Sequence, residues 1–163
     1  MLQAIPQSWF SWNFSVLDGA QSVADIRVSW WREHGQLTVQ GQPYRVFRDG
    51  FLGVRGAFIL ESAGVIVARA EKPSALRRCF RIEYAGRQYT LRATSAFRRA
   101  FHLLDGTTVI GSLAPEGIFT YRTTVDLPDD LPLPVQVFMI WLTVLLWQRD
   151  EDASAAVAAA GGG

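Results

Sequence analysis

Residues that commonly carry catalysis or bind metals are scarce in this sequence. The two histidines, His34 and His102, are far apart, and neither has the spacing of a metal ligand. We interpret His34, with Glu33 and Gly35, as part of a turn and His102 as part of a strand. The single cysteine, Cys79, follows two arginines that can lower a thiol pKa. Its place beside Phe80 in a strand favours a buried structural role, so we predict neither a metal site nor a catalytic thiol.

The short motifs of known enzyme classes are also missing. Gly50, Gly53 and Gly56 have neither the spacing nor the following helix of a nucleotide-binding loop. No Gly-x-Ser-x-Gly elbow of a serine hydrolase occurs. Carboxylates at positions 126, 129 and 130 are explained by the start of a helix, where negative charge is favourable. We therefore predict no catalytic residues, no cofactor and no enzymatic activity.

The chemistry that does stand out is cationic. The chain has 15 arginines and one lysine, and residues 66–102 carry nine basic and two acidic side chains. Residues 103–163 carry two basic and eight acidic ones, so a net charge of +1 conceals a polarised chain. Such asymmetry indicates an anionic partner, or two segments that neutralise each other after folding. The sequence leaves both interpretations open.

Alternation within this basic segment predicts which arginines face solvent. If Phe80, Ile82 and Leu91 point into a core, then Arg81 and Arg92 point outward. Loop residues on either side extend the basic surface. The predicted binding residues for an anionic headgroup or phosphate are Arg77, Arg78, Arg81, Arg92, Arg98 and Arg99.

The elements that must position these arginines are short strands. Apolar or alternating runs are separated by turn signals such as Asp18-Gly19, Asp49-Gly50 and Asp105-Gly106. No helical pattern separates them, which is typical of an antiparallel sandwich or barrel. The predicted strands are Trp9–Leu17, Ala24–Trp31, Gln36–Gln40, Tyr44–Arg48, Leu52–Leu60, Val65–Arg69, Cys79–Tyr84, Gln88–Ala93, Phe101–Leu104, Thr108–Leu113 and Ile118–Val125.

The pattern changes after Pro128. Residues 135–147 contain only two polar side chains, Gln136 and Thr143, which predicts a helix over about 134–148 that is apolar on every side. Such a helix must be enclosed by protein or by lipid. Its apolar run would span about 20 Å, against about 30 Å of bilayer hydrocarbon, and this favours a buried core helix over a membrane anchor.

Composition completes the predicted organisation. We expect one domain over residues 1–149 and a disordered acidic and Ala/Gly-rich tail over 150–163. The first residues lack the charge and apolar run of a signal peptide, and a lone cysteine excludes an intramolecular disulfide. We therefore expect a cytoplasmic protein.

A dozen or so strands before one wholly apolar helix resembles the tubby C-terminal-like superfamily, which includes tubby domains, plant LURP-one-related proteins and phospholipid scramblases. Its strands close into a barrel that is threaded by the last helix. The likeness is carried by Gly64–Ala70, Thr108–Leu113, Val125–Leu131 and Phe138–Trp141. The resemblance implies a mainly β fold: a closed antiparallel barrel of about a dozen strands around one central hydrophobic C-terminal helix.

The same resemblance implies a function. Tubby domains bind phosphoinositide headgroups through basic residues outside the barrel, and scramblases work at anionic membranes. We therefore expect a binding or scaffolding module that engages anionic membrane lipid at the inner membrane face, or a protein partner, and no nucleic acid. The scramblases' palmitoylated cysteine cluster is missing. The alternative is a small membrane protein with a soluble β domain and a C-terminal anchor.

Overall fold

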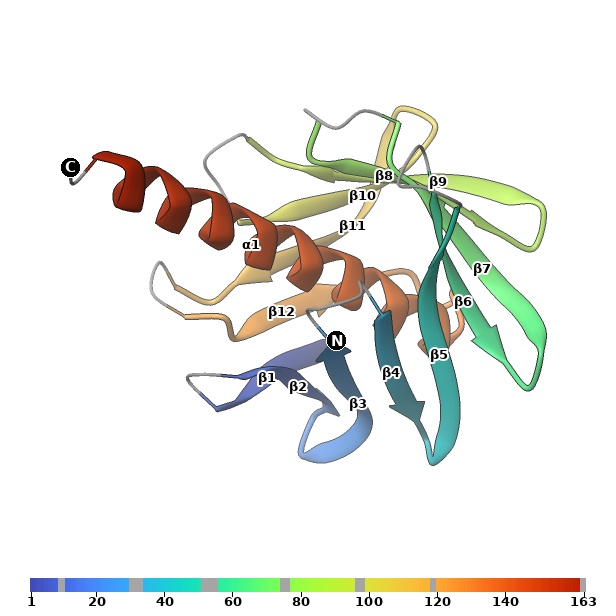
Figure 1. Ribbon diagram of the computed structural model, residues 1–163. Coiled ribbons are helices and arrows are strands. Elements are labelled where there is room, and N and C mark those ends of the chain that lie inside the picture. The colour runs from blue at the N-terminus through green and yellow to red at the C-terminus, as the bar shows by residue number, and fades with distance from the viewer. Residues whose placement is uncertain are drawn as a thin grey trace.

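Twelve antiparallel strands close into a single barrel in the part of the chain that the structure describes (Figure 1). The structure is a computed structural model, and it describes residues 1–8, 11–29, 34–50, 56–73, 77–95, 99–117 and 120–161. The strands are β1 (Leu2–Ser8), β2 (Ser11–Asp18), β3 (Gln21–Ser29), β4 (His34–Val39), β5 (Gln42–Asp49), β6 (Ala57–Ser62), β7 (Val65–Glu71), β8 (Cys79–Tyr84), β9 (Arg87–Ala93), β10 (Phe101–Asp105), β11 (Thr108–Pro115) and β12 (Thr123–Asp126).

The barrel is an up-and-down meander. Each strand pairs with its neighbours in sequence, and β1 closes the ring against β12 through Leu2 opposite Val125 and Ala4 opposite Thr123. Closure leaves none of the twelve described strands at a sheet edge, which removes the usual route to edge-to-edge aggregation. The predicted closed antiparallel barrel is confirmed.

The first strand, β1, is absent from the strands predicted from the sequence. Leu2–Ser8 contains Pro6, which cannot donate a backbone hydrogen bond and is uncommon within paired strands. The pairing register with β2 shifts between Pro6 and Ser8, at an irregularity in the strand. Leu2 and Ala4, on the regular side of this irregularity, are buried.

Helix α1 (Leu133–Gly161) runs through the barrel (Figure 1). Its residues 135 and 137–148 are all buried, and they form one core cluster with inward side chains of the strands such as Phe14, Phe58 and Phe80. A helix that is apolar on every side is enclosed here by the sheet on every side. The predicted central helix is confirmed. Among the described residues, no helix is both long and apolar enough to cross a membrane.

The helix continues beyond its buried part. Residues 150–161, which the sequence analysis assigned to a disordered tail, are helical and exposed. Alanine is the strongest helix former, and this segment is rich in it. The predicted end at about residue 148 therefore marks the mouth of the barrel and not the end of the helix.

The interpretation of His34 and Gly35 as a turn is wrong, because both belong to β4. Gly35 pairs with Val28 of β3 and Val46 of β5 and is itself buried. A β-carbon added at Gly35 would lie 2.3 Å from Nε1 of Trp141 in the helix. Position 35 therefore requires a glycine, because the indole of Trp141 packs directly on the strand backbone.

Candidate functional site

The basic segment gathers at one end of β8, β9 and β10. Arg78 immediately precedes β8, and its carbonyl accepts a hydrogen bond from the amide of Ala93, next to Arg92 at the end of β9. The amide of Thr94 donates to the carbonyl of Ala100, which brings Arg99 to the same end. Three of the six predicted residues therefore meet where these strands end.

Arg81 and Arg92 both face solvent, as the alternation predicted. Phe80, Ile82 and Leu91 are buried, whereas the two arginines are exposed. Arg81 lies opposite Thr90, so Arg92 is its diagonal neighbour on the same outer face, at a typical separation of roughly 7–8 Å. Neither guanidinium has an ion pair or hydrogen bond with another described residue.

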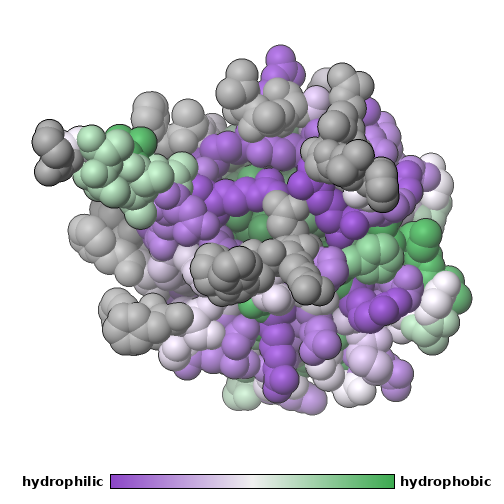
Figure 2. Space-filling model, in the orientation of Figure 1, coloured by the Kyte–Doolittle hydropathy of each residue, from purple (hydrophilic) through white to green (hydrophobic). Residues whose placement is uncertain are grey.

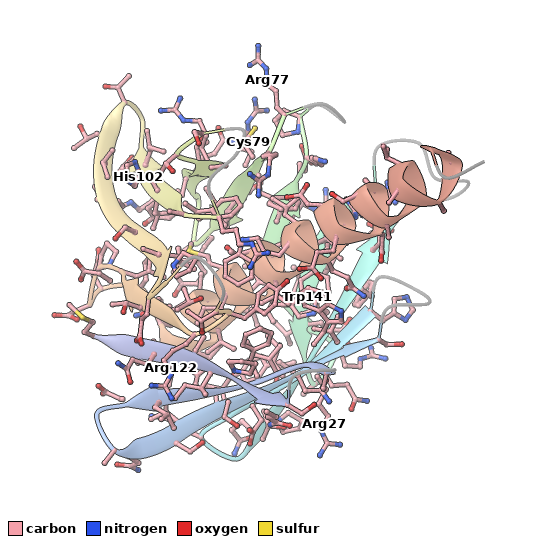
Figure 3. The ribbon with its side chains drawn as sticks, turned by 90° about the vertical axis from the view of Figure 1, so that its left-hand side faces the viewer. Arg27, Arg77, Cys79, His102, Arg122 and Trp141 are labelled. Carbon is pink, nitrogen blue, oxygen red and sulfur yellow. The ribbon has the colours of Figure 1, made fainter. Side chains whose placement is uncertain are left out.

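Arg77 extends the surface beyond the strands. Its side chain projects away from the barrel, above Cys79 (Figure 3), and it too has no polar partner among the described residues. Arg98 lies outside the described residues. We call Arg77, Arg81 and Arg92 the open arginines.

Arg78 and Arg99 are engaged by the helix instead. Nη2 of Arg78 lies 2.7 Å from Oδ2 of Asp150, and Nη2 of Arg99 lies 3.4 Å from Oε1 of Glu151. Both carboxylates belong to the first exposed turn of α1 outside the barrel. The basic and acidic segments therefore neutralise each other in part, and the six candidate residues divide into an open set and a paired set.

Aromatic side chains surround these pairs at the mouth of the barrel. The guanidinium of Arg99 lies 4.6 Å from the ring centre of Tyr121, which packs against Trp12 and Trp147. Nε1 of Trp147 donates a hydrogen bond of 3.0 Å to the carbonyl of Arg99. The mouth is therefore held by packing as well as by charge.

A second basic-to-acidic contact lies elsewhere on the surface. Arg87 hydrogen-bonds Asp105 at 2.8 Å and lies 3.5 Å from Asp130. The hydrogen bond to Asp105 raises the pKa of Arg87 above its ordinary value, with smaller contributions from nearby Tyr89 and Asp130.

Asp129 and Asp130 form a turn before the helix, whose first turn holds no acidic residue, so their interpretation as helix-start charges is wrong. Asp130 serves the Arg87 contact instead.

The histidines and the cysteine take structural positions. His102 is half-buried on β10 opposite Arg92, His34 is exposed at the start of β4, and Cys79 is buried as predicted. Within the described ranges, no three His, Cys, Asp or Glu side chains gather in a way that could hold a metal ion.

The outer surface also has a groove where β7 outruns β8. The last paired residues are Arg69 and Glu83, and Val65–Ala68 of β7 lie beyond the part of the strand that pairs with β8. The groove of about 370 Å³ is lined by Ile66, Val67, Ala68, Arg69, Glu83, Tyr84 and Ala85. Val65 and Ile66 are 66% and 59% exposed, and Figure 2 shows a hydrophobic area at the edge where Figure 1 draws the β6–β7 hairpin.

Comparison of the chain with family models, curated proteins and solved structures finds no match. The resemblance to the tubby-like superfamily therefore stays a prediction.

The outward positions of the open arginines on the strands follow from the sequence pattern, whereas the specific partners of the paired arginines do not. Alternation along β8 and β9 was enough to predict outward positions for Arg81 and Arg92. The contacts of Arg78 and Arg99 depend on where α1 leaves the barrel, which no local pattern encodes. The only signal was the net −6 charge after residue 102, which indicated mutual neutralisation without naming residues.

Proposed function

We propose that this protein is a non-enzymatic binding module that recognises anionic headgroups or phosphates through the outer surface at the ends of β8 and β9. The observation that carries the proposal is the set of open arginines. All three are exposed, and none has a polar partner among the described residues. Arg92 pairs with Cys79, and Arg77 and Arg81 lie two residues before and two residues after that cysteine. Like charges placed close together repel, and a bound anion relieves that repulsion.

The position of the site follows from how the barrel is filled. Because α1 occupies the interior, a ligand has to bind outside. Each basic side chain near an anionic membrane contributes about 1 kcal/mol at moderate salt. The three open arginines would together give binding that is weak, reversible and sensitive to salt.

The resemblance to tubby-like proteins supports the same proposal, binding of an anion on the outside of the barrel. In that superfamily an anionic headgroup is bound on the barrel exterior, and here the open arginines are exterior too. No headgroup motif of the superfamily is matched, so the proposal rests on the arginines of this chain. The neighbouring Glu71, which lies opposite Arg81 on β7, limits the positive charge on that side of the surface.

Vesicle flotation tests the proposal. The protein is mixed with vesicles of phosphatidylcholine alone, or of phosphatidylcholine with phosphatidylglycerol, at about 0.1 M and about 1 M salt, where the Debye length falls from about 10 Å to about 3 Å. We expect flotation only with the anionic vesicles and only at the lower salt. Flotation with neither kind of vesicle would contradict lipid binding and leave a scaffold whose partner is a protein.

The membrane-anchor alternative makes a different prediction in the same experiment. An anchored protein would float with both kinds of vesicle at both salt concentrations. The apolar residues that such an anchor would expose to lipid, from Val135 to Trp147, lie inside the barrel. This enclosure favours the peripheral binding module.

A further inference from the structure

The acidic turn at the mouth of the barrel occupies part of the proposed anion site. Asp150 and Glu151 form ion pairs with Arg78 and Arg99, two of the six predicted anion-binding residues. Their carboxylates present to these guanidinium groups the same chemistry that a phosphate would: oxygen acceptors bearing negative charge.

We propose that residues Asp150 and Glu151 form an autoinhibitory latch, an internal anion that an external headgroup or phosphate must displace to reach Arg78 and Arg99. The inference rests on the proposed function of the same surface. It divides the site into an always available part, the open arginines, and a latched part that becomes available when the end of α1 releases.

The contacts suit a latch that opens. The side chains of Asp150 and Glu151 are 50% and 45% exposed, whereas those of Arg78 and Arg99 are 18% and 36% exposed, so water reaches the carboxylates of both pairs and Arg78 is the more shielded cation. Water screens exposed ion pairs, so a ligand can displace Glu151 from Arg99, and the more shielded pair of Arg78 with Asp150 is the tighter part of the latch. Beyond them, residues 152–161 form an exposed helical segment, so that release would displace no buried core.

Opening would leave the barrel intact. Arg78 also lies 5.6 Å from the ring centre of Phe101, and Arg99 stacks on Tyr121, so both guanidinium groups keep aromatic contacts when the carboxylates leave. Trp147 stays anchored by its hydrogen bond to the carbonyl of Arg99. The arginines are thus held in place while the acidic turn moves.

The structure offers a matched pair of variants. Asp150→Asn removes one negative charge from the latch and keeps the side-chain shape. Asp152→Asn removes the same charge two residues further along, from a carboxylate that has no ion pair with a described residue. A general gain in attraction to anions would appear in both variants, whereas release of Arg78 would appear only in the first.

The experiment measures binding of the full chain to vesicles of phosphatidylcholine with phosphatidylglycerol at about 0.1 M salt. We expect Asp150→Asn, and likewise Glu151→Gln, to bind about fivefold more tightly than wild type, since one more cation near the surface is worth about that factor. Asp152→Asn should bind as wild type does. Equal gains in all three variants, or no gain in any, would overturn the latch while leaving wild-type binding as it was.

Two further results separate the latch from the proposed function. Binding by Asp150→Asn and Glu151→Gln, with none by wild type or Asp152→Asn, would support the latch and contradict the proposal that the open arginines alone bind the anion. Absence of binding by every variant would overturn the anion site and the latch together. Inorganic pyrophosphate, added as a soluble competitor, distinguishes the two sources of the anion. Release of the protein from the vesicles at millimolar pyrophosphate indicates a phosphate site, and retention indicates binding to a charged lipid surface. In both cases the difference in affinity between Asp150→Asn and Asp152→Asn decides whether the latch exists.

Discussion

Gly35 of β4 and Trp141 of α1 meet at the centre of the barrel so closely that a β-carbon on the glycine would lie 2.3 Å from the indole nitrogen and 2.9 Å from Cε2. The indole also packs against Phe58 and stacks on Phe138, with ring centres 5.4 Å and 6.4 Å away. The absence of a side chain at Gly35 therefore makes room for the indole of Trp141, which Figure 3 labels.

This contact predicts that Gly35→Ala destabilises the whole domain. The new methyl group would overlap a side chain that has no room to move, and overpacking of this kind costs about 1–3 kcal/mol. The free energy of unfolding, measured by urea titration, should fall by that amount. Gly117→Ala is the control, because the nearest atom to an added β-carbon there lies at 3.4 Å and belongs to a side chain. Equal stability of the two variants would contradict the packing described.

The two tryptophans of the helix should respond differently to removal of the indole N–H. Nε1 of Trp141 is buried and has no hydrogen-bond partner among the described residues, whereas Nε1 of Trp147 donates to the carbonyl of Arg99. A buried donor without a partner costs about 1–3 kcal/mol, so Trp141→Phe regains part of what it loses in packing. Trp147→Phe should therefore lower the free energy of unfolding by about 1 kcal/mol more than Trp141→Phe does. The reverse order in urea titration would contradict the prediction that the missing hydrogen bond of Trp141 outweighs the difference in packing loss.

The sequence was sufficient for the fold wherever a pattern is local. Alternation placed Phe80 and Leu91 inside and Arg81 and Arg92 outside, and the apolar run from residue 135 required an enclosed helix. It was insufficient where a residue serves a distant one. Gly35 resembles a turn residue in the sequence, because the indole of Trp141, which leaves no room for a side chain there, lies far along the chain. Arg78 and Arg99 were assigned to a ligand because their carboxylate partners belong to a helix whose exit point only the closed barrel defines.

The exposed end of α1 should contribute little to stability. Residues 153–161 are exposed and lie beyond the ion pairs, so a chain that ends at Asp152 keeps every buried contact. Its free energy of unfolding should stay within about 0.5 kcal/mol of the full chain, as for other surface changes. A chain that ends at Trp147 loses Gln148, which is buried, and both latch residues, and it should be less stable. A large loss from the shorter deletion would indicate that the end of the helix packs on the barrel.

The most direct test of the central claim is the affinity of single arginine variants for anionic vesicles. Arg81→Gln and Arg92→Gln remove open arginines, and Arg27→Gln removes an exposed arginine of β3 that lies at the opposite edge of the molecule from Arg77 in Figure 3. Each variant replaces the arginine by a shorter polar side chain, and each removes one charge. We predict that the first two weaken binding to phosphatidylglycerol-containing vesicles about fivefold each, the factor expected for one basic residue at the membrane surface, while the third binds as wild type does. Equal weakening of binding by all three variants would contradict a localised site, because the attraction to the membrane would then depend on net charge alone.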